Sequence, residues 1–390
     1  MAKLLLRGGT LLQAEKDFEP LSDAAIVVEG SKIKWVGKES SLSDKDYEQV
    51  LDVGGKTILP GLIDAHTHLA FNGKESLFKL YKDPRDKLIL EAIQSVATTI
   101  RSGVTTVRDV GGFEYVDVLL KNLIAEGAIL GPRMFVSGKM VTATGGHCHV
   151  IAEEADGVAE IKKASRNQVK KGADIVKMMV TGGGATAGQN VESTFLDAEE
   201  ISAAVGVARS LFRKSAAHAH GATGIKLAVR GGVDAIEHGS FLDEEGAQLM
   251  AKNKTYLVLT LGFESMFDEL DADWEARMEP VRARARETIA IAMAAGVPIA
   301  AGTDAGGNPY APHGLIKVVL QEMLDNGMTP AQILKSITIS AADLLDASSW
   351  LGSLEPGKAA DILVLDASPL DDITNVGEVA YVLKDGQIIR

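Results

Sequence analysis

The sequence predicts an α/β protein with parallel strands joined by crossover helices, built either as a barrel or as a large doubly wound sheet. The first observation is an alternation of short apolar segments and longer helical patterns between residues 59 and 347, which is typical of repeated βαβ units. The second is the length of 390 residues, which exceeds one ordinary domain of roughly 100–200 residues. A (β/α)₈ barrel uses about 250 residues, so further structure outside the alternating region is expected.

Each strand candidate of this middle region is a short run of apolar or β-branched residues, which favours a buried strand. In chain order the eight runs are 62–68, 105–110, 134–137, 175–181, 215–220, 235–238, 256–261 and 299–304. Helical patterns lie between them, for example at 87–101, 159–171, 198–213 and 275–295. Parallel neighbours need such crossover connections, so these strands and helices form the predicted core.

The two ends of the chain resemble each other and differ from the middle. The first 57 residues contain short β-leaning runs separated by turn signals. The last 35 or so residues have the same texture, and Asp385-Gly386 between two apolar runs is a strong hairpin signal. We therefore expect short strands at both ends of the chain.

Charge and cysteine content exclude several classes of protein. The chain carries 40 Lys and Arg residues against 53 Asp and Glu residues, for a net charge of −13, whereas a nucleic-acid partner requires a basic face. Cys148 is the only cysteine, so no intrachain disulfide can form. No apolar run reaches the roughly 18–20 residues of a membrane span, and the N-terminus lacks a signal-peptide core. We expect a cytoplasmic protein without a membrane or nucleic-acid partner.

Histidines and one aspartate stand at the ends of the predicted strands. His66 and His68 are two residues apart, and such side chains of a strand point to the same face. His218, His238 and Asp304 end the fifth, sixth and eighth runs. In a barrel these ends meet, and imidazole and carboxylate ligands suit zinc or a similar divalent ion. A pair of surface histidines stays the alternative interpretation of His66 and His68 alone.

Other charged residues allow two interpretations each. Lys177 lies within an apolar strand, where an unpaired ammonium is costly, or it extends to the strand end and reaches water. Arg108 either pairs with Asp109 or binds a substrate carboxylate. Glu237 faces away from His238 by strand alternation, which favours packing or an ion pair. We expect the arginines of 277–286 to lie on a solvated helix face.

Taken together, these residues resemble the amidohydrolase superfamily of metal-dependent hydrolases. The matching segments, in order, are LPGLIDAHTH, the strand with Lys177, the strand ending at His218, IEHG, GTDAG and the late GSLEPGKAADILVLD. The resemblance covers nearly the whole chain. It implies a (β/α)₈ TIM barrel over residues 58–349 and a small, discontinuous β-sandwich formed from residues 1–57 and 350–390.

The resemblance also implies a site for two divalent metal ions, with zinc the favoured element. His66, His68 and Asp304 would hold one ion, and His218 and His238 the other. Lys177 would bridge them as a carboxylated lysine. In such a site a hydroxide that bridges the metals is the nucleophile, and Asp304 would act as the catalytic group that moves protons.

Four further segments look most like the branch of Xaa-Pro dipeptidases and metal-dependent carboxypeptidases, whose relatives include imidazolonepropionase-like proteins and hydrolases of amide-linked toxins. They are TVRDVGG, TGGHCH, DIVKMMVTGGG and PHG. His147 is then expected to contact the substrate and to stabilise the developing oxyanion catalytically. The position of His220 is often a Tyr in relatives, with a substrate-binding role, so this histidine departs from the pattern. Loop 182–195 also departs from it, and its glycines favour a lid.

The leading function is hydrolysis of an amide or peptide bond in a dipeptide or an N-acyl amino acid. The alternative is a deaminase of a heterocyclic substrate on the same fold, although Gly221 and Thr223 stand where a glutamate of that class would be expected. A non-enzymatic binding protein is the third class, and it would be expected to lose ligands that are present here. The partners are then a small molecule or short peptide, and relatives of this kind often form homo-oligomers.

Overall fold

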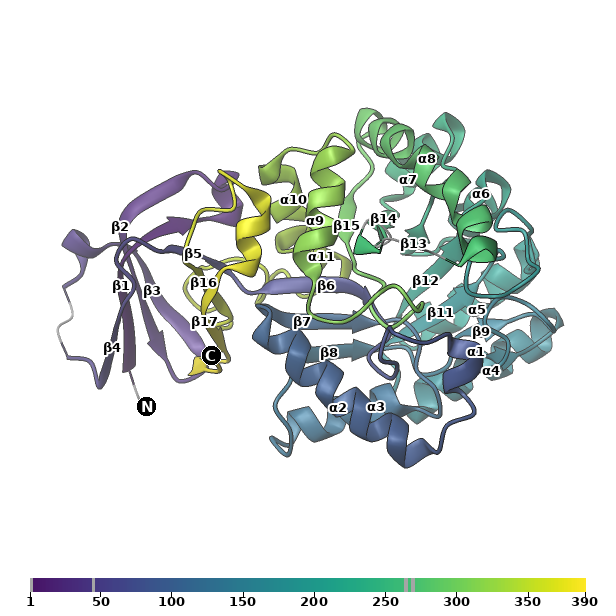
Figure 1. Cartoon of the computed structure of the whole chain (residues 1–390), viewed down its shortest axis with the longest axis horizontal. Coiled ribbons are helices and arrows are strands. Elements are labelled where there is room, and N and C mark those ends of the chain that lie inside the picture. Colours follow the sequence, from purple (N-terminus) through teal and green to yellow (C-terminus); the bar gives the residue numbers. More distant parts are fainter. Residues whose placement is uncertain (1–2, 44–45, 263–265, 268–270) are drawn as a thin grey trace.

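The computed structural model describes residues 3–43, 46–262, 266–267 and 271–390. Strands from the two ends of the chain form one sheet at one side of the molecule, and parallel strands with surrounding helices form the rest (Figure 1). In the part of the chain that is described, no helix combines the length and apolar character of a membrane-crossing segment.

The sheet at one side unites both chain ends in the order β18-β17-β16-β5-β1-β2-β3, with β4 paired to β1. Its alternating inward residues build a common apolar cluster that includes Leu6, Ile26, Ile58 and Val364. The expected strands at both ends are thus present, and all eight hydrogen-bond into a single sheet. Their bounds are β1 (Lys3–Leu12), β2 (Pro20–Glu29), β3 (Lys32–Lys38), β4 (Gln49–Asp52), β5 (Thr57–Pro60), β16 (Ile362–Leu365), β17 (Val379–Lys384) and β18 (Gln387–Ile388).

The middle of the chain forms two parallel sheets, one of three strands and one of seven. Every predicted strand is present, and two short strands, β9 and β10, were not predicted. The three-stranded sheet holds β6 (Leu62–Thr67), β7 (Val104–Asp109) and β8 (Arg133–Val136). The seven-stranded sheet holds β10 (Glu153–Glu154), β9 (Val141–Thr142), β11 (Ile175–Met179), β12 (Lys214–Ala219), β13 (Ala235–His238), β14 (Tyr256–Leu259) and β15 (Ile299–Ala301).

Backbone hydrogen bonds also connect the two parallel sheets to each other. The N–H of Asp304 donates to the carbonyl of His66 and the N–H of His68 to that of Ala305, both at 2.8 Å, which joins the end of β15 to β6. A second connection joins β8 to the start of β11, where the N–H of Asp174 donates to the carbonyl of Val136 at 2.7 Å. The strand ends that carry histidines are therefore held side by side.

Helices follow most strands and cover them, and the four predicted helical segments are all confirmed. Local signals explain several boundaries: Asp197 and Glu200 form a capping box at the start of α5, and Gly296 adopts a left-handed conformation where α8 ends. The bounds are α1 (Leu77–Leu80), α2 (Arg85–Arg101), α3 (Val116–Ala125), α4 (Gly157–Lys171), α5 (Ala198–Ser210), α6 (Ala222–Gly231), α7 (Glu244–Asn253), α8 (Ala272–Ala295), α9 (Ile316–Asp325), α10 (Pro330–Ser336) and α11 (Ile339–Leu344).

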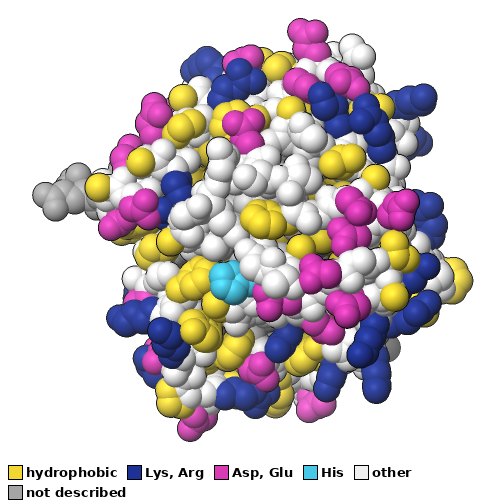
Figure 2. Space-filling view, turned by 90° about the vertical axis from the view of Figure 1, so that its right-hand side faces the viewer, with side chains coloured by type: hydrophobic (Ala, Val, Ile, Leu, Met, Phe, Trp, Pro, Cys, Tyr) yellow, Lys and Arg dark blue, Asp and Glu magenta, His cyan; other side chains and the backbone are white. Residues whose placement is uncertain are grey.

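One face of the molecule shows how its charges are distributed. In Figure 2, acidic and basic side chains are interspersed around a centre of apolar and uncharged groups. The excess of acidic residues in the sequence is therefore not gathered into one acidic patch on this face.

Candidate metal centre

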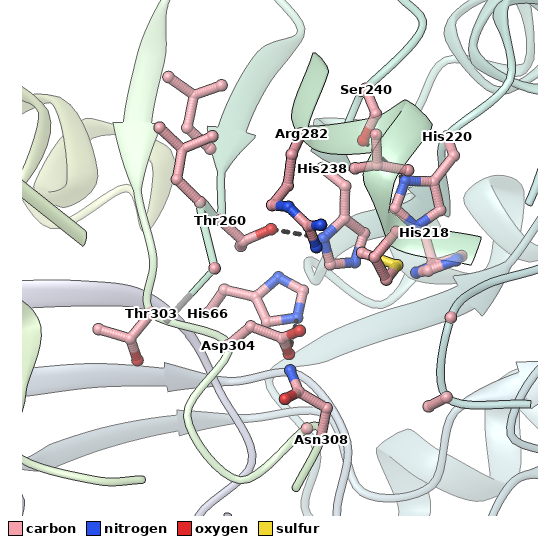
Figure 3. A pocket seen from close by; sticks show the side chains of 18 of the residues that line it. His66, His218, His220, His238, Ser240, Thr260, Arg282, Thr303, Asp304 and Asn308 are labelled. Atoms are coloured by element: carbon pink, nitrogen blue, oxygen red, sulfur yellow. Dashed lines mark hydrogen bonds and ion pairs between the residues drawn. The ribbon is translucent and has the colours of Figure 1, made fainter. Parts of the chain in front are cut away.

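A cavity of about 340 Å³ lies where the parallel strands end. Its lining includes side chains from β6, β11, β12 and β13 and from the segment after β15, and several of them point toward one another in Figure 3. The predicted metal ligands all contribute to it: His66, His68, Lys177, His218, His238 and Asp304. The carboxyl ends of parallel strands are where sites of this architecture form.

The first group of potential ligands is His66, His68 and Asp304. The Nε2 atoms of both histidines lie 3.3 Å from Oδ1 of Asp304. The opposite ring nitrogens, both Nδ1, face Glu237 Oε2 at 2.8 Å and the Gly111 carbonyl at 2.9 Å. Since those partners can only accept, each Nδ1 must donate. In a neutral ring the Nε2 atom then carries a lone pair, which points toward the carboxylate of Asp304. Three electron-rich atoms facing one another suit a cation.

The second group is His218, His220 and His238, whose ligand atoms also lie within 4.8 Å of one another. Each ring has one nitrogen held by the protein: His218 Nε2 faces the Gly182 carbonyl, His220 Nδ1 faces Ser240 Oγ, and His238 Nδ1 faces Thr260 Oγ1. Burial, with the neighbouring histidines, lowers the pKa values of His218 and His238 well below the usual range. Neutral rings with a free nitrogen can hold a second cation.

His220 was predicted to contact substrate, whereas the structure gathers it into this group of potential ligands. Burial, together with the charge of Lys177, lowers its pKa to about 4. Its ring stacks on that of His238 with a centroid distance of 4.8 Å. His220 still lines the cavity, so a ligand role and a substrate contact are both within its reach.

Lys177 is 1% exposed and lines the cavity. The side chain therefore does not reach bulk water, which contradicts the interpretation of a lysine extending to solvent. Burial lowers its pKa to about 8, and the charge of Arg108 acts in the same direction. Lys177 therefore loses its proton and becomes a neutral amine at a lower pH than a surface lysine does.

Arg108 was predicted either to bind a substrate carboxylate or to pair with Asp109, and the structure shows neither contact. Its side chain is 2% exposed, does not line the cavity, and pairs with Glu237 rather than Asp109. The pairing with Asp109 fails because neighbouring strand residues point to opposite faces. Asp109 instead accepts from the backbone N–H groups of Leu69 and Gly111. Glu237 has the ion-pair role that alternation favoured.

His147 enters the cavity from the loop after β9. Its Nδ1 lies 2.8 Å from Thr186 Oγ1 in loop 182–195, and its ring stacks on His218 at 4.5 Å. Burial, with the charge of His220, lowers its pKa to about 3, so the ring is neutral. Cys148 also lines the cavity, and burial raises its pKa to about 12, which makes it a neutral thiol.

Helix α8 supplies a wall of the cavity that sequence reasoning missed. Residues 277–286 were expected to present their arginines to solvent, but Arg282 lines the cavity, so that expectation is wrong for this residue. The lining residues recur at helical spacing along one face, but this face mixes apolar and charged side chains, so apolar periodicity did not mark it. They are Trp274, Glu275, Met278, Val281, Arg282, Ala285 and Thr288.

Comparison with known proteins places these features among hydrolases. The profile of the Amidohydrolase family matches residues 57–389. Ochratoxinase from Aspergillus niger is 29% identical, over 96% of this chain and 84% of its own length. Imidazolonepropionase from Pseudomonas putida is 27% identical, over 90% and 89%. The crystal structure of a Xaa-Pro dipeptidase with bound methionine in the active site is 33% identical, with a TM-score of 0.88 and 99% of both chains covered.

Proposed function

The chain belongs to the amidohydrolase family, and we propose that it is a binuclear metal hydrolase that cleaves the amide bond of a dipeptide or an N-acyl amino acid. The observation that carries this proposal is the pair of ligand groups that line one cavity together with the buried Lys177. The names of two relatives, an ochratoxinase and a Xaa-Pro dipeptidase, support an amide or peptide substrate.

Two divalent ions, with zinc favoured by the nitrogen-rich ligands, are assigned to the two groups. His66, His68 and Asp304 would hold one, and His218 and His238 would hold the other, with His220 as an additional nitrogen in the second group. Lys177 is carboxylated: its neutral Nζ attacks carbon dioxide, an N–C bond forms, and a proton leaves. The product is a carbamate anion, which supplies the oxygen ligands that an amine lacks.

Such ions lower the pKa of a water molecule and polarise a carbonyl when bound. Asp304 takes the proton from the attacking water and returns it to the leaving amine. His147 stabilises the carbonyl oxygen as charge develops on it. Thr186 Oγ1 accepts from the Cys148 N–H at 3.0 Å, so its own hydroxyl proton is available to His147 Nδ1, and Nε2–H is then the donor that faces substrate.

The fold proposed for this function is a (β/α)₈ barrel over 58–349 with a β-sandwich from 1–57 and 350–390. Backbone hydrogen bonds that join the end of β15 to β6 and β8 to the start of β11 support a closed barrel. The shared apolar cluster of both chain ends supports a separate accessory unit. A cytoplasmic location and a homo-oligomer stay predictions from the sequence.

Metal analysis of the purified protein tests the proposal. We expect about two divalent ions per chain in the wild type and a loss of metal in Lys177→Ala, with Lys252→Ala on an exposed helix as the matched control. One ion per chain that persists in Lys177→Ala would overturn the binuclear assignment. A panel of dipeptides and N-acyl amino acids, scored for free amine and for ammonia, separates amide cleavage from deamination of a heterocycle.

A further inference from the structure

Two cationic side chains stand among the described residues that line the cavity, Lys177 and Arg282. Lys177 is 1% exposed and lies within strand β11 among the histidines. Arg282 comes from helix α8, and in Figure 3 it extends toward the space beside His238 and Thr260. Its guanidinium is therefore the positive group that a substrate meets in the cavity outside the predicted metal ligands.

The hydrogen bonds of Arg282 are incomplete. Its Nη2 donates to Glu275 Oε1, while its Nη1 is buried without a hydrogen-bond partner. Oε2 of Glu275 is also buried without a partner. A guanidinium carries five N–H donors. The Arg282 side chain is 33% exposed, but its Nη1 atom is buried, and leaving a buried charged donor unpaired is costly. The Arg282–Glu275 pair thus has one donor, Nη1, and one acceptor, Oε2, without a hydrogen-bond partner.

We propose that Arg282 binds the free carboxylate of the substrate and makes the enzyme select anionic substrates. A carboxylate is the group that matches the planar donors of a guanidinium. Glu275 holds one edge of the guanidinium, and its second oxygen suits an N–H group next to that carboxylate. This assignment rests on the proposed amide hydrolysis and replaces Arg108, which is committed to Glu237.

The walls around Arg282 agree with an amino-acid substrate. Trp274, Met278 and Val281 on the same helix, together with Met140 and Leu261, also line the cavity. Apolar walls reduce the competition of water for the guanidinium, which strengthens a charge-assisted hydrogen bond. A substrate with one carboxylate and an apolar side chain fits both features.

The test compares two substrates that differ by one carboxylate, N-acetyl-L-phenylalanine and N-acetylphenethylamine. In the wild type we expect the carboxylate compound to be preferred in kcat/KM. Arg282→Gln should raise KM for N-acetyl-L-phenylalanine roughly 10–100-fold and remove most of the preference, with little change for the neutral compound. Arg282→Lys should restore part of it. Arg286→Gln, on the exposed side of the same helix, is the matched control.

Binding of both compounds, measured by isothermal titration, separates this inference from the proposed reaction. If neither compound is hydrolysed but the wild type binds N-acetyl-L-phenylalanine more tightly and Arg282→Gln does not, the reaction is wrong and the anion site stands. If the wild type hydrolyses both and Arg282→Gln leaves their ratio unchanged, the anion site is wrong and the reaction stands. Unchanged circular dichroism in Arg282→Gln shows that a folding defect is not the cause of the lost preference.

Discussion

Nη2 of Arg108 lies 2.6 and 2.7 Å from the two carboxylate oxygens of Glu237 in an ion pair that is almost entirely buried. The same carboxylate faces Nδ1 of His66 at 2.8 Å. Burial alone would raise the pKa of Glu237, but the charges of Arg108 and Lys177 outweigh it and lower this pKa to about 2. Glu237 therefore stays ionised and fixes both the orientation and the tautomer of His66.

Replacing Glu237 by Gln should destabilise the protein strongly. Removing one partner leaves the Arg108 charge buried and uncompensated, which costs about 3–5 kcal/mol in comparable pairs. We expect this loss in the free energy of unfolding of the metal-free protein, measured with urea. Metal content should also fall, because the His66 ring is no longer held.

The exposed pair of Arg230 and Glu245 gives the control for this experiment. Glu245→Gln should change the free energy of unfolding far less, since water screens an exposed pair. A loss below about 1 kcal/mol in Glu237→Gln would show that the buried pair does not stabilise the fold.

The partner of Arg108 illustrates what the sequence can and cannot predict. In the middle of the chain, apolar and β-branched runs identified every strand of three or more residues, because local composition determines them. The two-residue strands β9 and β10 carry too little pattern. An ion pair between β7 and β13 depends on which side chains face each other inside the molecule, and strand sequences do not contain that information.

Strand-end histidines could be predicted as one site because the architecture brings those ends together. Arg282 was missed for a different reason. Its helix lacks a clear apolar stripe, since apolar and charged residues are mixed around it, and a cavity wall with charged members resembles a solvated face. The hydroxyl partners of the histidines, such as Thr186 and Ser240, have no sequence signal at all.

The buried carboxyl of Asp117 should make stability depend on pH. Burial, with the charge of Asp174, raises its pKa to about 6, against about 3.9 in an unfolded chain. Between these values the folded state binds more protons, so the free energy of unfolding falls as pH rises through this window. Above about pH 6 the penalty is complete.

Asp117→Asn removes this contribution, because the amide oxygen can still accept from the Gly138 N–H without titrating. We expect the variant to gain stability relative to the wild type between pH 5 and pH 8, by on the order of 1 kcal/mol, in urea unfolding. Asp371→Asn, on the surface, should follow the wild type at both pH values. Parallel pH profiles for Asp117→Asn and the wild type would contradict the prediction.

His147→Gln should slow the reaction without removing metal. A lost donor to a developing oxyanion typically costs 10²–10³ in kcat. His147 belongs to neither group of potential metal ligands, so its loss should leave the metal in place. His149→Gln is the matched control, because His149 is two residues away, contacts Phe78 and does not line the cavity. Equal kcat values for the two variants, at full metal content, would remove His147 from the catalytic groups.

Gly302 allows the close approach of β15 and β6 that brings Asp304 to His66. A Cβ atom at this position would lie 2.4 Å from Cβ of His66 and 2.7 Å from its backbone nitrogen, so Gly302→Ala must push the two strands apart. Overpacking of this kind costs about 1–3 kcal/mol, and the displaced ligands should bind less metal. Thermal unfolding and metal analysis measure the two effects.

Gly206 provides the opposite case within helix α5. A Cβ there meets no atom within 4 Å apart from its chain neighbours and the backbone of its own helix, and a helical Gly→Ala change normally stabilises by roughly 0.5–1 kcal/mol. Gly206→Ala should therefore raise the melting temperature and keep all of its metal, while Gly302→Ala lowers both. If Gly302→Ala retained the wild-type melting temperature and metal content, β6 and the end of β15 would be able to accommodate a Cβ atom despite these short distances. The positions of His66 and Asp304 would then not depend on this glycine.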